Sequence, residues 1–179
     1  MGDSMSDSLR GKLLIASPSL YDYFRRAVVL VLEHTGDGAM GVILNRVSET
    51  PVADAVPALA DLTDGHELVR LGGPVALESV VALGDFEDPS EASTSVFDSV
   101  GVVDPDGPPP ALRRMRVFAG HAGWAPGQLD GELEQKAWIV EPALSDDPFH
   151  DADLWPLALE RKGGSFSLLA TMPADPSLN

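Results

Sequence analysis

Residues 118–129 combine several glycines with side chains that could hold a ligand. The glycines remove side-chain bulk, so backbone amides can face a bound group, and the start of a following helix favours an anion. Trp124 offers a flat stacking face, Gln128 offers a polar amide, and His121 follows the first glycine of the segment. The alternative is a strand–turn–helix corner in which Trp124 fills the core. The segment therefore predicts either a small binding corner or a structural one.

Residues 36–41 match the pattern G-x-G-x-x-G, which is typical of dinucleotide-binding loops. In such a loop the glycines open a helix, whose N-terminal amides bind the pyrophosphate. Here the next residues are Val42, Ile43 and Leu44, and β-branched residues of this kind favour a strand. We therefore expect residues 36–41 to form a hairpin turn and to bind no dinucleotide.

The chain lacks the residue patterns of common catalytic and metal sites. It contains no cysteine, which removes disulfides, iron–sulfur clusters and thiol catalysis. It also lacks a nucleophile elbow, a P-loop and the paired histidines of zinc proteases. A metal site shared by His34 and His121 stays open as an alternative. We expect no catalytic residue, no metal and no cofactor.

The charge of the chain is strongly acidic and unevenly distributed. Asp and Glu number 28 against 12 Lys and Arg, and residues 51–179 carry 22 of the acids but only seven of the bases. Nucleic acids bind mainly through neutralisation of their phosphates. The basic clusters at residues 25–26 and 113–116 are too small to form a convincing stripe. The composition therefore argues against direct nucleic-acid binding and indicates an acidic, solubilising surface.

The length of 179 residues and an apolar share of 44% are typical of one globular domain. Residues 1–10 are small and polar, and we expect them to form a flexible segment ahead of a domain over residues 11–179. The longest apolar run, at residues 27–32, is far shorter than a membrane span or a signal sequence requires. The sequence predicts a cytoplasmic protein without a membrane partner.

Short apolar segments in pairs dominate the pattern of secondary structure. Strands are predicted at residues 13–16, 27–32, 41–45, 68–71, 80–83, 115–119 and 137–140, with an edge strand at 99–103. Helices are predicted after Thr50 with a break at Pro57, around residues 126–133, and from Asp153 to the glycines at 163–164. We expect residues 120–123 to form a tight turn and residues 165–170 to be extended. The pattern favours a single α+β domain with a mostly antiparallel or mixed sheet and a few flanking helices.

Several motifs occur in order over residues 11–140. They are Leu14-Ile15-Ala16 with Pro18, Leu20, Asp22, Phe24 and Arg26; Glu33-His34 with Gly38-Ala39-Met40-Gly41 and Asn45-Arg46; Gly72-Gly73-Pro74; and Gly120, Ala122, Trp124, Gly127-Gln128-Leu129, Glu132 and Trp138. Together they resemble the AlgH/YqgE family. The resemblance implies a small cytoplasmic α+β domain with a curled sheet, in a family labelled as transcriptional regulators. It supplies no catalytic residue.

Three positions depart from the family pattern. His121 stands where many members carry tyrosine, Val47 replaces a proline, and the chain ends in Asp175-Pro176-Ser177-Leu178-Asn179 instead of a Gly-His-Ala tail. The first departure argues against any role that needs a phenol at position 121.

The family-matching corners provide the candidate site. We expect them to line one surface depression that binds a small anion or a carboxylate of a protein partner, with Arg46 as the positive charge. The candidate residues are Asn45, Arg46, Gly72, Gly73, His121, Trp124 and Gln128. The competing interpretation is that each corner is a separate packing device. We expect a regulatory or interaction protein that acts through protein partners or a small ligand; the alternative is a small-molecule-binding or anion-binding domain or an unrecognised enzyme.

Overall fold

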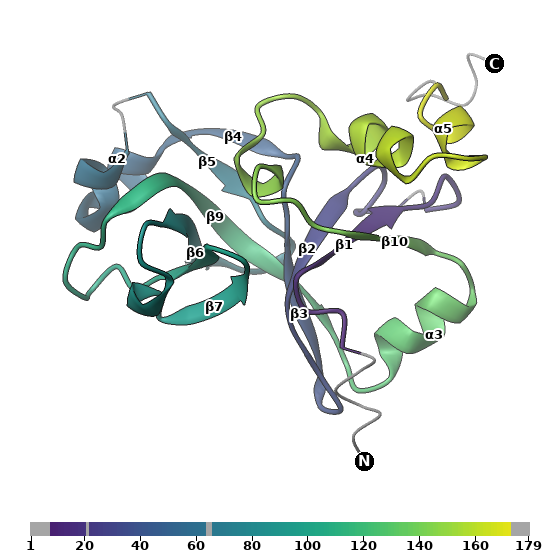
Figure 1. Cartoon of the computed structure of the whole chain (residues 1–179), viewed down its shortest axis with the longest axis horizontal. Coiled ribbons are helices and arrows are strands. Elements are labelled where there is room, and N and C mark those ends of the chain that lie inside the picture. The colour runs from purple at the N-terminus through teal and green to yellow at the C-terminus, as the bar shows by residue number, and fades with distance from the viewer. Residues whose placement is uncertain (1–7, 21, 64–65, 173–179) are drawn as a thin grey trace.

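The computed structural model describes residues 8–20, 22–63 and 66–172, which form one α+β domain around a mostly antiparallel sheet (Figure 1). The strands are β1 (Lys12–Ala16), β2 (Val28–Thr35), β3 (Gly38–Ile43), β4 (Val47–Pro51), β5 (Leu68–Leu71), β6 (Val75–Phe86), β7 (Thr94–Phe97), β8 (Val100–Val103), β9 (Leu112–Trp124) and β10 (Trp138–Pro142). The helices are α2 (Val52–Ala55), α3 (Gln128–Glu134), α4 (Leu154–Lys162) and α5 (Phe166–Leu169), with 3-10 helices η1 (Pro57–Leu62), η2 (Pro89–Glu91) and η3 (Asp147–Phe149). This confirms the fold class expected from the sequence. Residues 1–7 of the segment expected to be flexible, and residues 173–179, lie outside the described residues.

Strand β9 joins the two halves of the sheet. The strand order is β10-β1-β2-β3-β9-β6-β8-β7, and the β4–β5 pair attaches to β9 through a short parallel contact. The end of β9 pairs with β3, while most of its length pairs with β6. The β6–β9 pairing shifts register between Val75 and Val80, and such a bulge bends a sheet. Figure 1 shows β9 running diagonally from the half with β6 and β7 to the half with β1, β2 and β3.

Strand β2 lies in the core with both faces covered. Its alternate residues enter two different apolar clusters, because successive side chains of a strand point to opposite faces. One cluster packs against α4 and includes Trp155, and the other packs against α3 and includes Trp124 and Trp138. The apolar run at residues 27–32 predicted this two-sided burial, and the structure confirms it.

Residues 36–41 belong to the β2–β3 hairpin, as expected. Gly36 and Asp37 form its turn, and Gly41 pairs with Val31 across an antiparallel ladder. Strand β3 follows the turn, so these glycines do not open a helix. The hairpin interpretation of the G-x-G-x-x-G pattern is confirmed.

The prediction of a tight turn at residues 120–123 is wrong, because strand β9 continues through these residues to Trp124. Gly120 has a φ of 73°, a left-handed conformation that glycine adopts at little cost. A Cβ atom at this position would also collide with the carbonyl oxygen of Gly73. The glycines therefore allow two backbones to cross closely, and they do not reverse the chain.

Several helix and edge predictions are resolved by the structure. Helix α2 ends before Pro57 and a 3-10 helix begins there, which confirms the expected break. Thr50 is not a helix cap, because it lies in β4, and residues 165–170 contain helix α5 where an extended segment was expected. The strand expected at residues 99–103 is present as β8, but its expected edge position is wrong, because β8 lies between β6 and β7 and β7 forms the edge. Among the described residues, no helix is long and apolar enough to cross a membrane.

The buried carboxylate of Asp85 ties β6 to β9. It accepts hydrogen bonds from Ser99 Oγ at 2.6 Å, Arg114 NH2 at 2.8 Å and Arg113 NH1 at 3.2 Å. Burial raises the pKa of the Asp85 carboxyl, but the hydrogen bonds from Ser99 and Arg114 and the charges of both arginines outweigh burial, so its pKa lies below the ordinary value. A carboxyl pKa that is lower in the folded state stabilises the fold at pH values above the pKa of the same group in the unfolded chain. This contribution is lost as the pH falls through the folded-state pKa.

We therefore expect Asp85→Asn to destabilise the protein more at pH 7 than at pH 3. At neutral pH the substitution leaves the two arginines without their buried counter-charge. At pH 3, below the ordinary pKa of an aspartate, the unfolded chain already binds the proton, so part of the contribution of the charge is lost in the wild type as well. Urea unfolding of the wild type and the variant at both pH values measures the difference. An equal loss of stability at the two pH values would contradict this role of the Asp85 charge.

Candidate functional site

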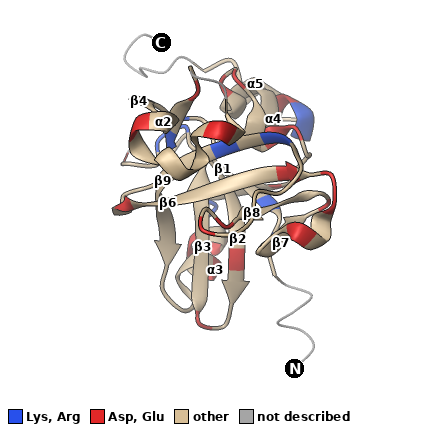
Figure 2. Cartoon of the chain, turned by 90° about the vertical axis from the view of Figure 1, so that its left-hand side faces the viewer, with Lys and Arg blue, Asp and Glu red and all other residues tan. Residues whose placement is uncertain are grey.

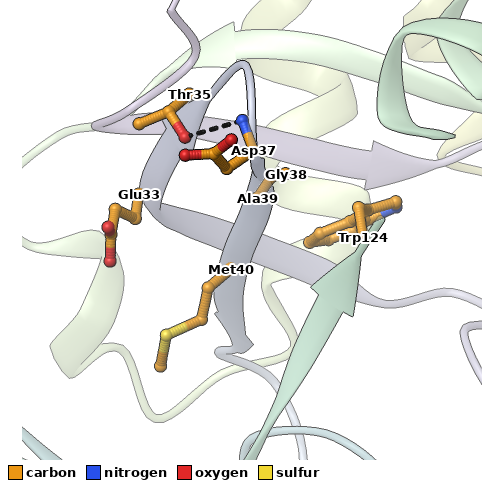
Figure 3. Close-up of a pocket in the computed structure, with 7 residues that line it drawn as sticks. All are labelled: Glu33, Thr35, Asp37, Gly38, Ala39, Met40 and Trp124. Atoms are coloured by element: carbon orange, nitrogen blue, oxygen red, sulfur yellow. Dashed lines mark hydrogen bonds between the residues drawn. The ribbon is translucent and has the colours of Figure 1, made fainter. Parts of the chain in front are cut away.

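A depression of about 210 Å³ lies beside the end of the β2–β3 hairpin (Figure 3). It is lined by Glu33, Thr35, Asp37, Gly38, Ala39, Met40 and Trp124. The hairpin supplies all of these residues except Trp124, which comes from the end of β9 and pairs with Ala39 in the ladder. The site is therefore built where β9 meets the hairpin.

Carboxylates dominate the polar groups of this depression. Glu33 and Asp37 are both exposed, and residues 33–40 include no lysine or arginine. The Asp37 backbone N–H donates to Thr35 Oγ1 at 3.1 Å, a bond that fixes the turn (Figure 3). The indole of Trp124 packs on the opposite face of the sheet, in the cluster against α3, and the Trp124 carbonyl lies against Gly38. The thioether of Met40 adds apolar surface. This combination suits a positively charged group carried on an apolar stem, such as a lysine or arginine side chain.

One carboxylate of α3 holds Trp124 in place. Glu132 Oε1 accepts the indole N–H of Trp124 at 2.9 Å and that of Trp138 at 2.8 Å. The amide of Gln128 donates to Glu132 Oε2 at 3.0 Å, and its oxygen accepts the Ala125 N–H at 2.9 Å. Trp124 is only 7% exposed, and its ring packs in the apolar cluster against α3. The polar groups of Trp124 and Gln128 are therefore engaged within the corner itself.

His34 connects the hairpin to the N-terminal segment and to α3. Its Nδ1 accepts the Leu9 N–H at 3.0 Å, and its Nε2 lies 3.9 Å from Asp130 Oδ1. Among the described residues, no group of three or more metal-ligating side chains could hold a metal ion.

Asn45 and Arg46 bind the chain segment that leads into β2. The Asn45 side chain pairs with backbone groups of residues 26–28, accepting one N–H at 3.0 Å and donating to one carbonyl at 2.9 Å. It also donates to Asp153 Oδ1 at 2.9 Å. Arg46 donates to a carbonyl of the same segment at 3.0 Å, and its guanidinium carbon lies 4.7 Å from the centre of the Tyr23 ring. Both side chains thus hold neighbouring parts of the fold.

The structure brings some of the predicted site residues together. The Arg46 carbonyl accepts the N–H of Leu71, so the Asn45-Arg46 corner lies beside the Gly72-Gly73 corner, and the backbone of Gly73 lies against that of His121. Trp124 and Gln128 meet separately at Glu132. That all seven residues line one depression stays a prediction.

Sequence reasoning did not select Glu33 and Asp37 as site residues. The available signal was that Glu33-His34 and Gly38-Ala39-Met40-Gly41 match the family pattern on both sides of the turn. Pairing of this hairpin with the end of β9 brings both segments to Trp124.

Comparisons with known proteins agree over nearly the whole chain. A family model described as AlgH-like matches residues 13–167. UPF0301 proteins of Streptomyces coelicolor and Thermobifida fusca are 44% and 42% identical to this chain, each over 96% of both sequences. The crystal structure of protein DIP2367 from Corynebacterium diphtheriae has a TM-score of 0.83 and 32% identity, covering 92% of this chain and 93% of that one. The solution structure of AlgH from Pseudomonas aeruginosa has a TM-score of 0.71 and 27% identity, covering 93% and 95%.

Proposed function

This chain belongs to the AlgH-like family, and we propose that it acts as a regulatory interaction protein that binds a basic segment of a protein partner beside the β2–β3 hairpin. The observation that carries the proposal is the depression of about 210 Å³ at the end of the hairpin, which is lined by Glu33, Asp37 and Met40. A lysine or arginine side chain of the partner would place its charge at the carboxylates and its apolar stem against Met40.

The overall charge supports a basic partner. A net charge of −16 attracts positively charged segments over long distances and increases their rate of encounter. The hairpin end contributes acidic residues to this field, whereas the basic residues in Figure 2 lie mainly in the half that contains β4, β9 and α4. Attraction and docking would thus favour the same end of the molecule.

The positions of the arginines argue against direct DNA binding. Arg113 and Arg114 are paired with Asp85, and Arg116 is paired with Glu67 and Asp151. Guanidinium groups that already bind carboxylates are poorly placed to neutralise a row of phosphates. The basic cluster at residues 113–116 therefore favours an internal role over a nucleic-acid surface.

We expect a short peptide of alternating arginine and alanine to bind the wild type at 150 mM salt and to bind Glu33→Gln/Asp37→Asn about two- to tenfold more weakly. The substitutions remove two charges and keep the side-chain shapes. Isothermal titration calorimetry gives the affinities, and the backbone amide NMR signals of Gly38 and Trp124 report the location.

The matched control is Glu78→Gln/Glu160→Gln, which removes two exposed charges elsewhere and should retain the wild-type affinity. An equal loss of peptide affinity in both double variants would mean that binding depends only on the net charge of the protein. That result, or an absence of shifts at Gly38 and Trp124, would contradict the proposed site.

A further inference from the structure

Two largely buried arginines lie side by side beneath the segment that joins η3 to α4. Arg70 comes from β5 and Arg116 from β9, and their side chains are 12% and 8% exposed. Arg70 pairs with Phe118 in the parallel β5–β9 contact, two residues along β9 from Arg116. The strand pairing therefore fixes two positive charges on one face of the sheet. Strand β5, which carries Arg70, lies well away from the hairpin end of the molecule (Figure 1).

Each guanidinium nitrogen of Arg116 makes a hydrogen bond, whereas Nε of Arg70 makes none. Arg116 donates to Glu67 Oε1 at 3.0 Å, to the His150 carbonyl at 2.8 Å and to Asp151 Oδ1 at 2.8 Å. Arg70 NH2 lies 3.5 Å from the same Asp151 oxygen, and Arg70 Nε is buried without a hydrogen-bond partner. Burial and the neighbouring charge of Arg116 lower the pKa of Arg70, against the opposite effects of Glu67 and Asp151. One oxygen of the Asp151 carboxylate thus forms ion pairs with both guanidinium groups.

Asp151 is the exposed member of this cluster. Its side chain is 89% exposed and lies in an irregular stretch between η3 and α4. Because the Asp151 carboxylate reaches the arginines from the solvent side, a ligand that supplies the same negative charge to them could take its place. An adjacent depression of about 420 Å³ is lined by Arg114, Asp146 and residues 149–152. It offers space next to Asp151 for a ligand or for the displaced side chain.

We propose that Arg70 and Arg116 form a binding site for a phosphate group, which replaces the Asp151 carboxylate. A phosphate has enough terminal oxygens to accept from Arg116 NH2 and from both Nε and NH2 of Arg70, the bidentate geometry that guanidinium groups favour. Glu67 stays on Arg116 Nε and keeps that side chain in position. The bound group would satisfy the buried Arg70 Nε, which the Asp151 carboxylate leaves unpaired. This site goes beyond the proposed docking of a basic partner and does not depend on it.

The test is a titration of inorganic phosphate into the full chain, followed by calorimetry and by NMR of the arginine Nε–H groups. The wild type should bind, and the Arg70 Nε–H signal, identified by its absence in Arg70→Lys, should move on binding. Asp151→Asn removes the competing charge and should bind phosphate about two- to fivefold more tightly. Arg70→Lys keeps the positive charge but loses the fork of donors, and it should bind at least about fivefold more weakly.

The control for Asp151→Asn is Asp106→Asn, an exposed acid in the loop before β9 that should leave phosphate affinity unchanged. An equal gain in phosphate affinity in both variants would mean that only the net charge matters, and it would overturn the proposal. So would an Arg70 Nε–H signal that does not move, or phosphate binding that Arg70→Lys leaves intact. A parallel titration with glycerol phosphate separates the sources of the group: tighter binding than inorganic phosphate supports a phosphate ester as the ligand, and weaker binding supports the free ion.

Discussion

Replacing Gly120 with alanine is expected to lower the free energy of unfolding by about 3 kcal/mol or more. A left-handed backbone costs a residue with a Cβ atom roughly 1–2 kcal/mol, and overpacking adds about 1–3 kcal/mol. Both apply here, because Gly120 has a φ of 73° and its Cβ would collide with the carbonyl oxygen of Gly73. Leu77 Cδ2 at 3.0 Å and the Val75 carbonyl at 3.1 Å close the remaining space. Urea unfolding monitored by circular dichroism measures the loss.

Gly131→Ala is the matched control in the same chain. Gly131 lies within α3, and a Cβ atom there would meet nothing within 4 Å. Alanine favours a helix over glycine by roughly 0.5–1 kcal/mol, so this variant should be slightly more stable than the wild type. If Gly120→Ala proved as well tolerated as Gly131→Ala, the close crossing of the two backbones could not be a constraint on the fold.

Trp155→Ala is expected to destabilise the protein by about 3–5 kcal/mol, the usual range for removal of a large buried side chain. Trp155 is 1% exposed and packs in the cluster between α4 and the sheet. Its indole N–H donates to the Ala16 carbonyl at 2.8 Å, and the guanidinium carbon of Arg26 lies 4.0 Å from its ring centre. The substitution therefore opens a cavity, leaves a buried carbonyl unpaired and removes the surface on which Arg26 rests.

Two further variants separate these contributions. Trp155→Phe keeps most of the apolar surface but leaves the Ala16 carbonyl unpaired, so it should cost about 1–3 kcal/mol. Leu168→Ala changes a side chain that is 72% exposed and should stay within about 0.5 kcal/mol of the wild type. Thermal and urea unfolding rank the three variants, and a loss for Trp155→Ala no larger than that for Leu168→Ala would refute the role of Trp155 in the core.

Local sequence patterns predicted the parts of the fold that depend on neighbouring residues. The apolar run at residues 27–32 indicated a strand buried on both faces, and the glycines before Val42 indicated a hairpin. The break at Pro57 follows from the missing N–H and fixed φ of proline. In each case the physical cause lies within a few residues of the element, so no tertiary contact was needed.

The turn predicted at residues 120–123 failed for the opposite reason. A glycine can serve a reversal or a close approach of another backbone, and here the approaching chain is Gly73, far away in the sequence. The candidate site depended on tertiary contacts in the same way. Glu33 and Asp37 come near Trp124 only because β3 pairs with the end of β9. The arginines at 113–116 pair with carboxylates of β6 and of segments that precede and follow β9 in the sequence.

The position of β9 in the chain has a consequence for folding during synthesis. Strands β3, β5 and β6 all pair with β9, yet all three precede it in the sequence. A chain made from its N-terminus exposes these strands before their common partner has left the ribosome, and unpaired strand edges promote aggregation. Completion of the sheet must await residues 112–124, so a nascent chain stopped before them would hold a hairpin and a set of open edges without the strand that unites them.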